Sequence, residues 1–346
     1  MKAIFIFSIS LLLSYQSYSQ TNLAQAKSVG SDDWGYVNPS GEFVIKPQFA
    51  VCHAFSKDGF APIYDKKEKT FFFIRPDGSR LVTEIDKFKL QNIFGFGTKG
   101  FEDGMAAVQV GKQWGYLNLD GKLVIQAKYD KALEFNGGFG VAKSGNSFFI
   151  IDKNGKETKV EIAGLEDVRS FSEGLAPYRT NGIWGFIDTS GKVAIEAAYT
   201  GIGYMINGLA WAKNEAGLVG FINSKGEMKI EANYQAAKDF SDGVARVKMD
   251  TWSFIDANGT KINPPIADTY GKFSDGLAYA KTGGKVGFIN KKGEWVIKPI
   301  YDKVRDFNNG YAAVLVGDKW GFVDKTGKFT IEPTFEAVKD FESTSK

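Results

Sequence analysis

The stretch that decides the fold of this chain is Trp320-Gly321-Phe322-Val323-Asp324-Lys325-Thr326-Gly327-Lys328. It begins with aromatic and β-branched residues, which strands prefer. It continues with an Asp-x-x-Gly segment that fits a hairpin loop, because aspartate caps such a turn and glycine takes its left-handed conformation. A second copy at Trp184 is followed by Lys192-Val193-Ala194-Ile195, which fits a returning partner strand. The stretch therefore predicts an antiparallel hairpin.

The same hairpin pattern recurs along the whole chain. Its turn glycine is found nine times, at intervals of 33 to 43 residues, at Gly41, Gly78, Gly121, Gly155, Gly191, Gly226, Gly259, Gly293 and Gly327. An apolar-Ile-x-Pro/Ala-x-aromatic run follows many copies, as at Val296-Ile297-Lys298-Pro299-Ile300-Tyr301. A Phe-x-x-Gly-apolar-Ala run forms a third signature, as in 273–278. A near-constant period of this length indicates a tandem array of one structural unit.

Each unit reads as a three-stranded antiparallel β-meander of about 35 residues, because three short apolar segments are separated by turn residues. The hairpins are expected at 114–118 with 122–125, and equivalently at Trp184, Trp252 and Trp320. The segment between meanders, such as 302–307, fits either a fourth short strand or a single helical turn.

The chain ends bear on whether the array closes. Leu23-Ala24-Gln25-Ala26-Lys27 matches Leu277-Ala278-Tyr279-Ala280-Lys281, and Phe341 completes the connector of the ninth unit. No unit is recognisably split between the termini, and nine units exceed the usual 4–8 blades of a propeller. We therefore expect an all-β, open, curved, solenoid-like stack over 20–346 as one continuous domain, with a closed β-propeller-like ring as the alternative.

The composition excludes several classes of function. Forty glycines against nine prolines, with 29 Phe, 14 Tyr and 7 Trp, suit short strands joined by tight turns. The net charge of +3 is spread over the chain, which lacks the basic stripe that nucleic-acid binding requires. One cysteine and one histidine supply neither an internal disulfide nor a four-ligand zinc site. We expect no metal and no cofactor.

Residues 1–19 have the pattern of a secretory signal peptide. Lys2 provides the positive n-region, 3–13 form an apolar h-region, and Ser17 and Ser19 place small residues before a cut at Gln20. An apolar run of this length is too short for a stable membrane anchor. We expect an exported mature chain, periplasmic, cell-surface or extracellular, with no stable membrane insertion after cleavage.

The repeats resemble the WG (KWG) repeat family of bacterial proteins. The Trp-Gly pair occurs at Trp34, Trp114, Trp184 and Trp320, and Lys319 completes a Lys-Trp-Gly. Some copies depart from the pattern: Phe71, Phe148, Val219 and Val286 replace tryptophan, and Phe72, Phe149 and Ser253 replace glycine. The resemblance implies an all-β tandem array, often exported, and no established catalytic activity.

Most candidate sites have a simple structural explanation. Trp, Phe and Val interchange at one repeat position, which favours core packing over a stacking platform for ligands. Cys52 and His53 are neighbours that point to opposite faces of an extended chain and are not expected to form a catalytic dyad. The Asp-x-Asn-Gly segments at Asp152 and Asp256 lack the third acidic position and the glutamate of a calcium loop and fit ordinary turns.

One stretch departs from the period, namely the 43-residue interval from Gly78 to Gly121. Insertions into repeat arrays map to loops that often carry binding. Phe88, Phe94, Phe96 and Lys99 are therefore the candidate partner-binding loop, the alternative being a longer connector with buried aromatic rings.

Taken together, the sequence predicts a non-enzymatic exported binding or scaffold module for a protein or a cell-envelope polymer, because stacked units form an extended surface. The alternative is a cell-envelope glycan-binding module, since repeated aromatic hairpins also suit sugar stacking. A hydrolase is less favoured because no convergent polar constellation is found. An outward row of aromatic rings would favour the glycan, and buried rings the protein partner.

Overall fold

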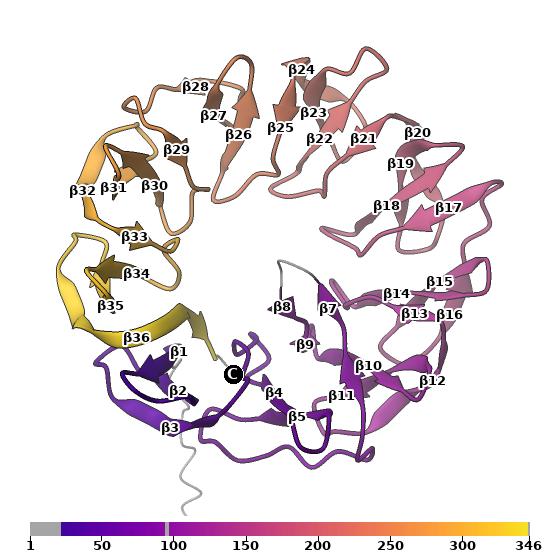
Figure 1. Ribbon diagram of the computed structural model, residues 1–346. Coiled ribbons are helices and arrows are strands. Elements are labelled where there is room, and N and C mark those ends of the chain that lie inside the picture. Colours follow the sequence, from indigo (N-terminus) through magenta and orange to yellow (C-terminus); the bar gives the residue numbers. More distant parts are fainter. Residues whose placement is uncertain (1–21, 94–96, 345–346) are drawn as a thin grey trace, which may run out of the picture.

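The computed structural model describes residues 22–93 and 97–344, which form an all-β array of nine units arranged around a circle (Figure 1). The expected tandem array of antiparallel meanders is confirmed. The expected signal peptide lies outside the described residues. In the described part of the chain no helix has the length and apolarity that crossing a bilayer requires.

Four strands in meander order make up a complete unit. Unit one contains β1 (Asn22–Ser28), β2 (Trp34–Val37) and β3 (Phe43–Phe49), and unit two contains β4 (Ala61–Asp65) and β5 (Thr70–Ile74). Unit three contains β6 (Lys89–Leu90), β9 (Phe101–Glu102), β10 (Met105–Val110), β11 (Gln113–Asn118) and β12 (Leu123–Tyr129). Units four and five contain β13 (Lys131–Ala132), β14 (Phe139–Ser144), β15 (Ser147–Asp152), β16 (Glu157–Lys159), and β17 (Leu165–Val168), β18 (Leu175–Thr180), β19 (Ile183–Asp188), β20 (Val193–Tyr199).

The remaining units follow the same plan. Units six and seven contain β21 (Gly201–Ile202), β22 (Leu209–Lys213), β23 (Val219–Asn223), β24 (Met228–Tyr234), and β25 (Ala236–Ala237), β26 (Val244–Lys248), β27 (Trp252–Asp256), β28 (Lys261–Ile262). Units eight and nine contain β29 (Thr269–Tyr270), β30 (Leu277–Thr282), β31 (Lys285–Asn290), β32 (Trp295–Tyr301), and β33 (Lys303–Val304), β34 (Tyr311–Val316), β35 (Lys319–Asp324), β36 (Phe329–Ser343).

The segment between meanders forms the short first strand of the next unit, which settles the choice between a strand and a helical turn. In unit six, β21 pairs with β22 through Gly201↔Lys213 and Ile202↔Ala212. The turn that follows has positive φ at both Asn207 (54°) and Gly208 (76°), as a two-residue hairpin turn requires. In other units, as at 273–276, the Phe-x-x-Gly signature of the sequence marks this turn, and in unit six Met205 takes the place of its Phe.

The hairpins around the turn glycines form as predicted. In unit nine, Asp324 Oδ1 accepts the backbone N–H groups of Thr326 at 2.8 Å and Lys328 at 3.1 Å. Gly327 takes a φ of 87° in the same loop. The Thr326 hydroxyl and these backbone donors lower the pKa of Asp324. Local turn chemistry therefore forms the loop that returns the chain into the last strand.

The glycine of Trp-Gly permits close contact between the third and fourth strands. A Cβ on Gly185 would lie 2.4 Å from the carbonyl oxygen of Ile195. At this point the pairing of β19 with β20 shifts register, between Trp184↔Tyr199 and Phe186↔Ile195. Five other units carry the same glycine and the same shift, a β-bulge. The glycine is thus a steric requirement of the bulge.

The two ends of the array meet. The long strand β36 first pairs with β35, through Phe322↔Ile331, and then with β1, through Ala24↔Phe341. Its second half therefore serves as the first strand of unit one, and a single sheet runs β3-β2-β1-β36-β35-β34-β33. The expected open stack is corrected in favour of its alternative, the closed ring, because Phe341 lies within a strand that pairs with both ends of the array and does not belong to a connector.

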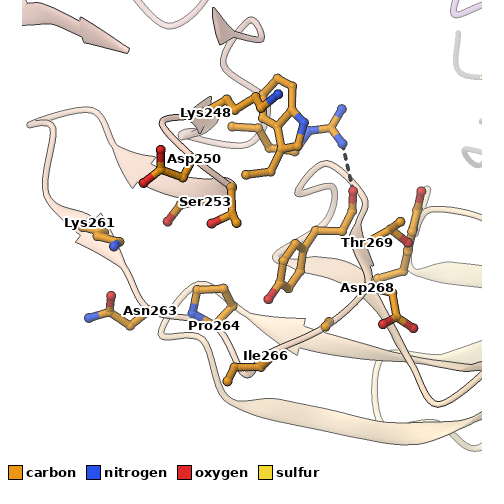
Figure 2. A pocket seen from close by; sticks show the side chains of 15 residues that line it. Lys248, Asp250, Ser253, Lys261, Asn263, Pro264, Ile266, Asp268 and Thr269 are labelled. Atoms are coloured by element: carbon orange, nitrogen blue, oxygen red, sulfur yellow. Dashed lines mark hydrogen bonds between the residues drawn. The ribbon is translucent and has the colours of Figure 1, made fainter. Parts of the chain in front are cut away.

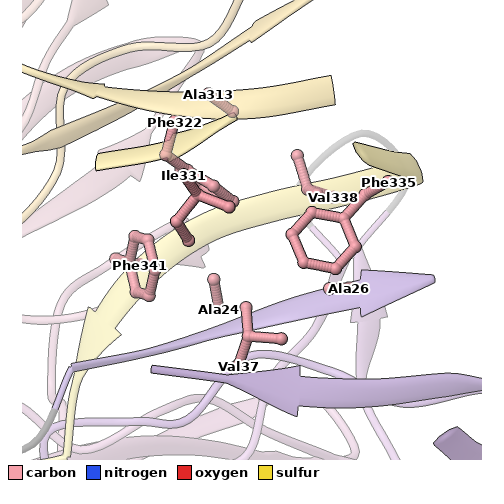
Figure 3. Packing of buried hydrophobic residues seen from close by; sticks show 9 residues of the cluster. All are labelled: Ala24, Ala26, Val37, Ala313, Phe322, Ile331, Phe335, Val338 and Phe341. Atoms are coloured by element: carbon pink, nitrogen blue, oxygen red, sulfur yellow. The ribbon is translucent and has the colours of Figure 1, made fainter. Parts of the chain in front are cut away.

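The core is divided among the joints between units. The described residues contain nine buried apolar clusters, one for each pair of neighbours around the ring. An open stack of nine units would have eight such joints. The ninth cluster places Phe341, Phe335 and Val338 of β36 between Phe322 of unit nine and Ala24 of unit one (Figure 3). Packing as well as backbone pairing therefore closes the ring.

Candidate functional site

The expected partner-binding loop is only partly described. Phe88 is 3% exposed and stacks on Phe73, with ring centroids 5.7 Å apart, so it belongs to the core between units two and three. This corrects its assignment as a binding residue. Lys99 is half-buried, and its backbone N–H bonds to the carbonyl of Gln91. Phe94 and Phe96 lie outside the described residues. The small hairpin β7 (Asn92–Ile93) and β8 (Gly97–Thr98) projects toward the centre of the ring (Figure 1).

Cys52 and His53 occupy different surroundings. Gln25 Nε2 donates to the Cys52 carbonyl at 2.8 Å and lies 3.6 Å from its sulfur. Burial raises the pKa of the Cys52 thiol, and burial together with Lys339 lowers the pKa of His53. A neutral, buried thiol is a weak nucleophile, which agrees with the structural explanation of this pair.

The tryptophans of the repeats differ in exposure. Trp184 is 8% exposed and packs in the core between units five and six, as expected for a core position. The guanidinium of Arg169 lies 3.8 Å from its ring centroid. Trp252, the equivalent residue of unit seven, is 37% exposed. Unit seven is therefore the place where the repeat leaves its tryptophan accessible.

Two features of unit seven, Ser253 and a pair of prolines, account for this difference. Ser253 stands where six units have glycine, and its Cβ is incompatible with the bulged fourth strand. β28 accordingly pairs with β27 without a register shift, and only at Phe254↔Ile262 and Ile255↔Lys261. The chain then turns into Pro264 and Pro265, which cannot donate to a ladder. The fourth strand ends before it reaches Trp252.

The result is a cavity of about 880 Å³ between units seven and eight, here called the unit-seven cavity. Its walls include Trp252, Ser253, Lys261, Asn263 and Tyr270. Figure 2 shows Lys248, Asp250 and Ser253 facing Lys261, Asn263 and Pro264 across it.

The unit-seven cavity is polar at its rim. Lys248, Lys261, Asp250 and Asp268 all line it, and none of them takes part in a salt bridge among the described residues. Arg246 completes the charged set with a third cation. These charges are therefore free to pair with a ligand.

Arg246 and Tyr270 form the inner wall of the cavity. Arg246 Nη1 donates to the Tyr270 carbonyl at 2.8 Å (Figure 2), and its guanidinium lies 5.9 Å from the Trp252 ring centroid. Within the described residues, Arg246 Nε is buried without a hydrogen-bond partner. Tyr270 Oη donates to the Pro265 carbonyl at 2.5 Å, and burial raises the pKa of Tyr270. The wall is held in place by these bonds.

The sequence identifies Ser253 as a departure from the glycine of the repeat, but the pattern of the repeats predicted no cavity at this position. Three features of the sequence could have indicated the cavity: Ser253, the Pro264-Pro265 pair, and Ala267. Ala267 stands fifteen residues after Trp252, the distance at which the aromatic Tyr199 follows Trp184. In residues 22–93 and 97–344, no group of three or more His, Cys, Asp or Glu side chains is placed to hold a metal ion. The unit-seven cavity places an aromatic face beside charged and amide groups.

The fold defines a β-propeller-like ring of four-stranded antiparallel units. The sequence model of the WG containing repeat matches residues 34–67, 114–147, 148–182, 184–216, 220–250, 252–285, 287–320 and 320–343. The chain belongs to the WG-repeat family.

Comparison with solved structures supports the fold. The chain is similar to a structure described as the eukaryotic initiation factor, with a TM-score of 0.61, 10% identity, and coverage of 95% of this chain and 99% of the other. It is also similar to the dihydro-heme d1 dehydrogenase NirN, with a TM-score of 0.50, 13% identity, and coverage of 93% and 75%. At these identities the likeness concerns the fold alone. No curated protein matches the chain.

Proposed function

We propose that this protein is an exported, non-enzymatic binding module whose partner is a protein. The signal-peptide pattern of residues 1–19 supports export to the periplasm, the cell surface or the medium. The ring of similar units supports a scaffold role, because each joint is held by its own buried cluster and the units together form an extended surface.

The observation that carries this proposal is the unit-seven cavity. It combines an exposed aromatic ring, Trp252, with free charges of both signs in one concave place. Tryptophan and arginine in a pocket of this kind are typical centres of protein interfaces. A protein partner is favoured over a long glycan because, at this repeat position in the described residues, Phe148 and Trp184 are buried and the other rings are only partly exposed, so Trp252 alone is exposed.

The alternative is a glycan-binding module. Trp252 beside Asn263, Asp250 and Asp268 also fits a single sugar ring stacked on an aromatic face. This reading predicts Trp252-dependent binding of soluble oligosaccharides and no dependence on a protein.

An affinity capture experiment tests the proposed function. Mature protein, residues 20–346, is immobilised and exposed to envelope protein fractions, with Ile300→Ala as the matched control, because Ile300 is a 60% exposed apolar residue that does not line the unit-seven cavity. We expect one discrete protein to be retained by the wild type and by the control. Retention of glycan alone, or of no protein at all, contradicts the proposal.

A further inference from the structure

The six bulged units show what normally covers the repeat position that Trp252 occupies. In each of them an aromatic residue of the fourth strand pairs directly with that position: Trp34↔Phe49, Trp114↔Tyr129, Trp184↔Tyr199, Val219↔Tyr234, Val286↔Tyr301 and Trp320↔Phe335. Directly opposed side chains of this kind are the unit of sheet stabilisation. The fourth strand therefore supplies both backbone pairing and an aromatic cover.

Unit seven lacks both contributions. β28 ends at Ile262, and the residue at the sequence distance of the aromatic is Ala267. Trp252 stays 37% exposed as a result. The unit-seven cavity occupies the place where the outer half of a fourth strand lies in the six bulged units.

The backbone edge of β27 is also left open at this place. Unit four likewise lacks the glycine, because Phe149 replaces it, and its fourth strand also pairs without a bulge. There Val160 N donates to the carbonyl of Phe148, the counterpart of Trp252, at 2.9 Å. The residue of unit seven that corresponds to Val160 is Pro264, which has no N–H to donate. The Trp252 carbonyl therefore lacks the donor that unit four supplies.

We propose that the unit-seven cavity binds an extended peptide segment of the partner protein, which adds to the edge of β27 and places an aromatic side chain against Trp252. Strand addition of this type draws affinity from backbone hydrogen bonds and specificity from alternate side chains. The inference rests on the proposed function and names the form in which the partner is recognised.

The charged side chains that line the cavity indicate which charge the bound peptide should carry. Lys248, Lys261 and Arg246 line it with three cationic groups against the carboxylates of Asp250 and Asp268. The net positive lining matches a peptide that carries an acidic residue a few positions from its aromatic one. The unbulged fourth strand of unit four has an acidic residue at this spacing, with Glu157 three residues before Val160, whose N–H bonds to the carbonyl of Phe148.

A labelled peptide copying residues 157–162 of the unbulged fourth strand of unit four, with tyrosine in place of Val160 (Glu-Thr-Lys-Tyr-Glu-Ile), is the probe, because Ser253 excludes a bulged strand. Fluorescence anisotropy measures its binding to the mature protein, to Trp252→Ala and to the matched control Ile300→Ala. We expect saturable binding to the wild type and to Ile300→Ala. Binding to Trp252→Ala is expected to weaken about tenfold or more, as for loss of a central aromatic contact. A peptide with serine in place of tyrosine is expected to lose affinity by a similar factor.

A second variant controls for the case in which Trp252→Ala loses binding because it misfolds. Lys261 is exposed, so Lys261→Glu is expected to fold normally while weakening the acidic probe several-fold. Equal binding to Trp252→Ala, equal binding of the serine peptide, or no binding of the probe overturns the inference. Trp252-dependent binding of chitohexaose without peptide binding overturns it in favour of a glycan. If Trp252→Ala still captures the envelope partner, the proposed function stands and the strand-addition inference fails.

Discussion

Asp275 Oδ2 accepts a hydrogen bond from the backbone N–H of Gly310 at 2.6 Å, and so joins the first hairpin turn of unit eight to that of unit nine. Equivalent contacts join other neighbours: Asp58 to Gly104, Asp103 to Gly138, Glu173 to Gly208, and Asp242 to Gly276. Asp103, Glu173, Asp242 and Asp275 stand at the first turn position, where φ is positive. The side chain of a turn residue in one unit thus also forms a hydrogen bond that connects this unit to the next one.

Asp275→Ala removes this joint contact and is expected to lower the free energy of unfolding by about 1 kcal/mol, the usual net worth of such a hydrogen bond. Chemical denaturation measures the change. Asp318→Ala is the control, because the Asp318 side chain is 86% exposed and, among the described residues, its one salt bridge is to its neighbour Lys319, at 3.4 Å. Equal stability of the two variants would show that the turn carboxylates do not hold the joints.

Substitution of the Trp-Gly glycine is expected to distinguish bulged from unbulged units. Gly185→Ala places a Cβ 2.4 Å from the Ile195 carbonyl oxygen, and the backbone shift that follows is expected to cost about 1–3 kcal/mol. Ser253→Ala, at the same repeat position in unit seven, replaces one Cβ-bearing residue by another and is expected to change stability by less than about 0.5 kcal/mol. Thermal unfolding of both variants tests the pair. A larger loss for Ser253→Ala would refute the steric account.

The two tryptophans at equivalent positions are expected to respond differently to truncation. Trp184→Ala removes a buried ring and is expected to cost about 3–5 kcal/mol. Trp252→Ala removes a half-exposed ring and is expected to cost much less. Hydrogen exchange should show the Trp184 loss concentrated in residues 175–200, because the stability of an array is a sum over units and joints. Unchanged protection there would mean that Trp184 is not part of the core.

Closure of the ring can be tested at Phe341. This side chain is fully buried between units nine and one, and Phe341→Ala is expected to cost about 3–5 kcal/mol. Because β1 pairs with β36, the amides of 22–28 are expected to exchange faster in this variant. An open stack predicts instead that protection of 22–28 is independent of Phe341.

Asp306 is expected to make stability depend on pH. Burial raises its pKa, and within the described residues its Oδ1 has no hydrogen-bond partner. A carboxyl whose folded pKa is raised stabilises the fold below the unfolded pKa of about 3.9, and this stabilisation is lost as pH rises through the folded pKa. Asp306→Asn is therefore expected to exceed the wild type in stability at pH 7 and to match it below pH 4. A deficit at pH 7 would mean that nearby Lys272 and Arg305 outweigh the cost of burial.

The repeat, the hairpins and their turns follow from the sequence by itself, because the information lies within short windows. Asp324 and Gly327 specify a loop four residues long, and the Trp184 run specifies the strand beside it. The interchange of Trp, Phe and Val at one position indicated a packed site, which holds at Trp184, Phe148 and Val219. No contact beyond the neighbouring unit enters these inferences.

Closure and the cavity were decided only by the tertiary structure. Ala24 and Phe341 pair across almost the entire chain, and whether they meet depends on the rotation from unit to unit summed over nine joints, which no single unit specifies. The exposure of Trp252 likewise follows from the close approach of strands at the bulge, where Ser253 forces the fourth strand away. The replacement of glycine by Ser253 can be seen in the sequence, but its effect on the exposure of Trp252 depends on the distance between the third and fourth strands of the unit.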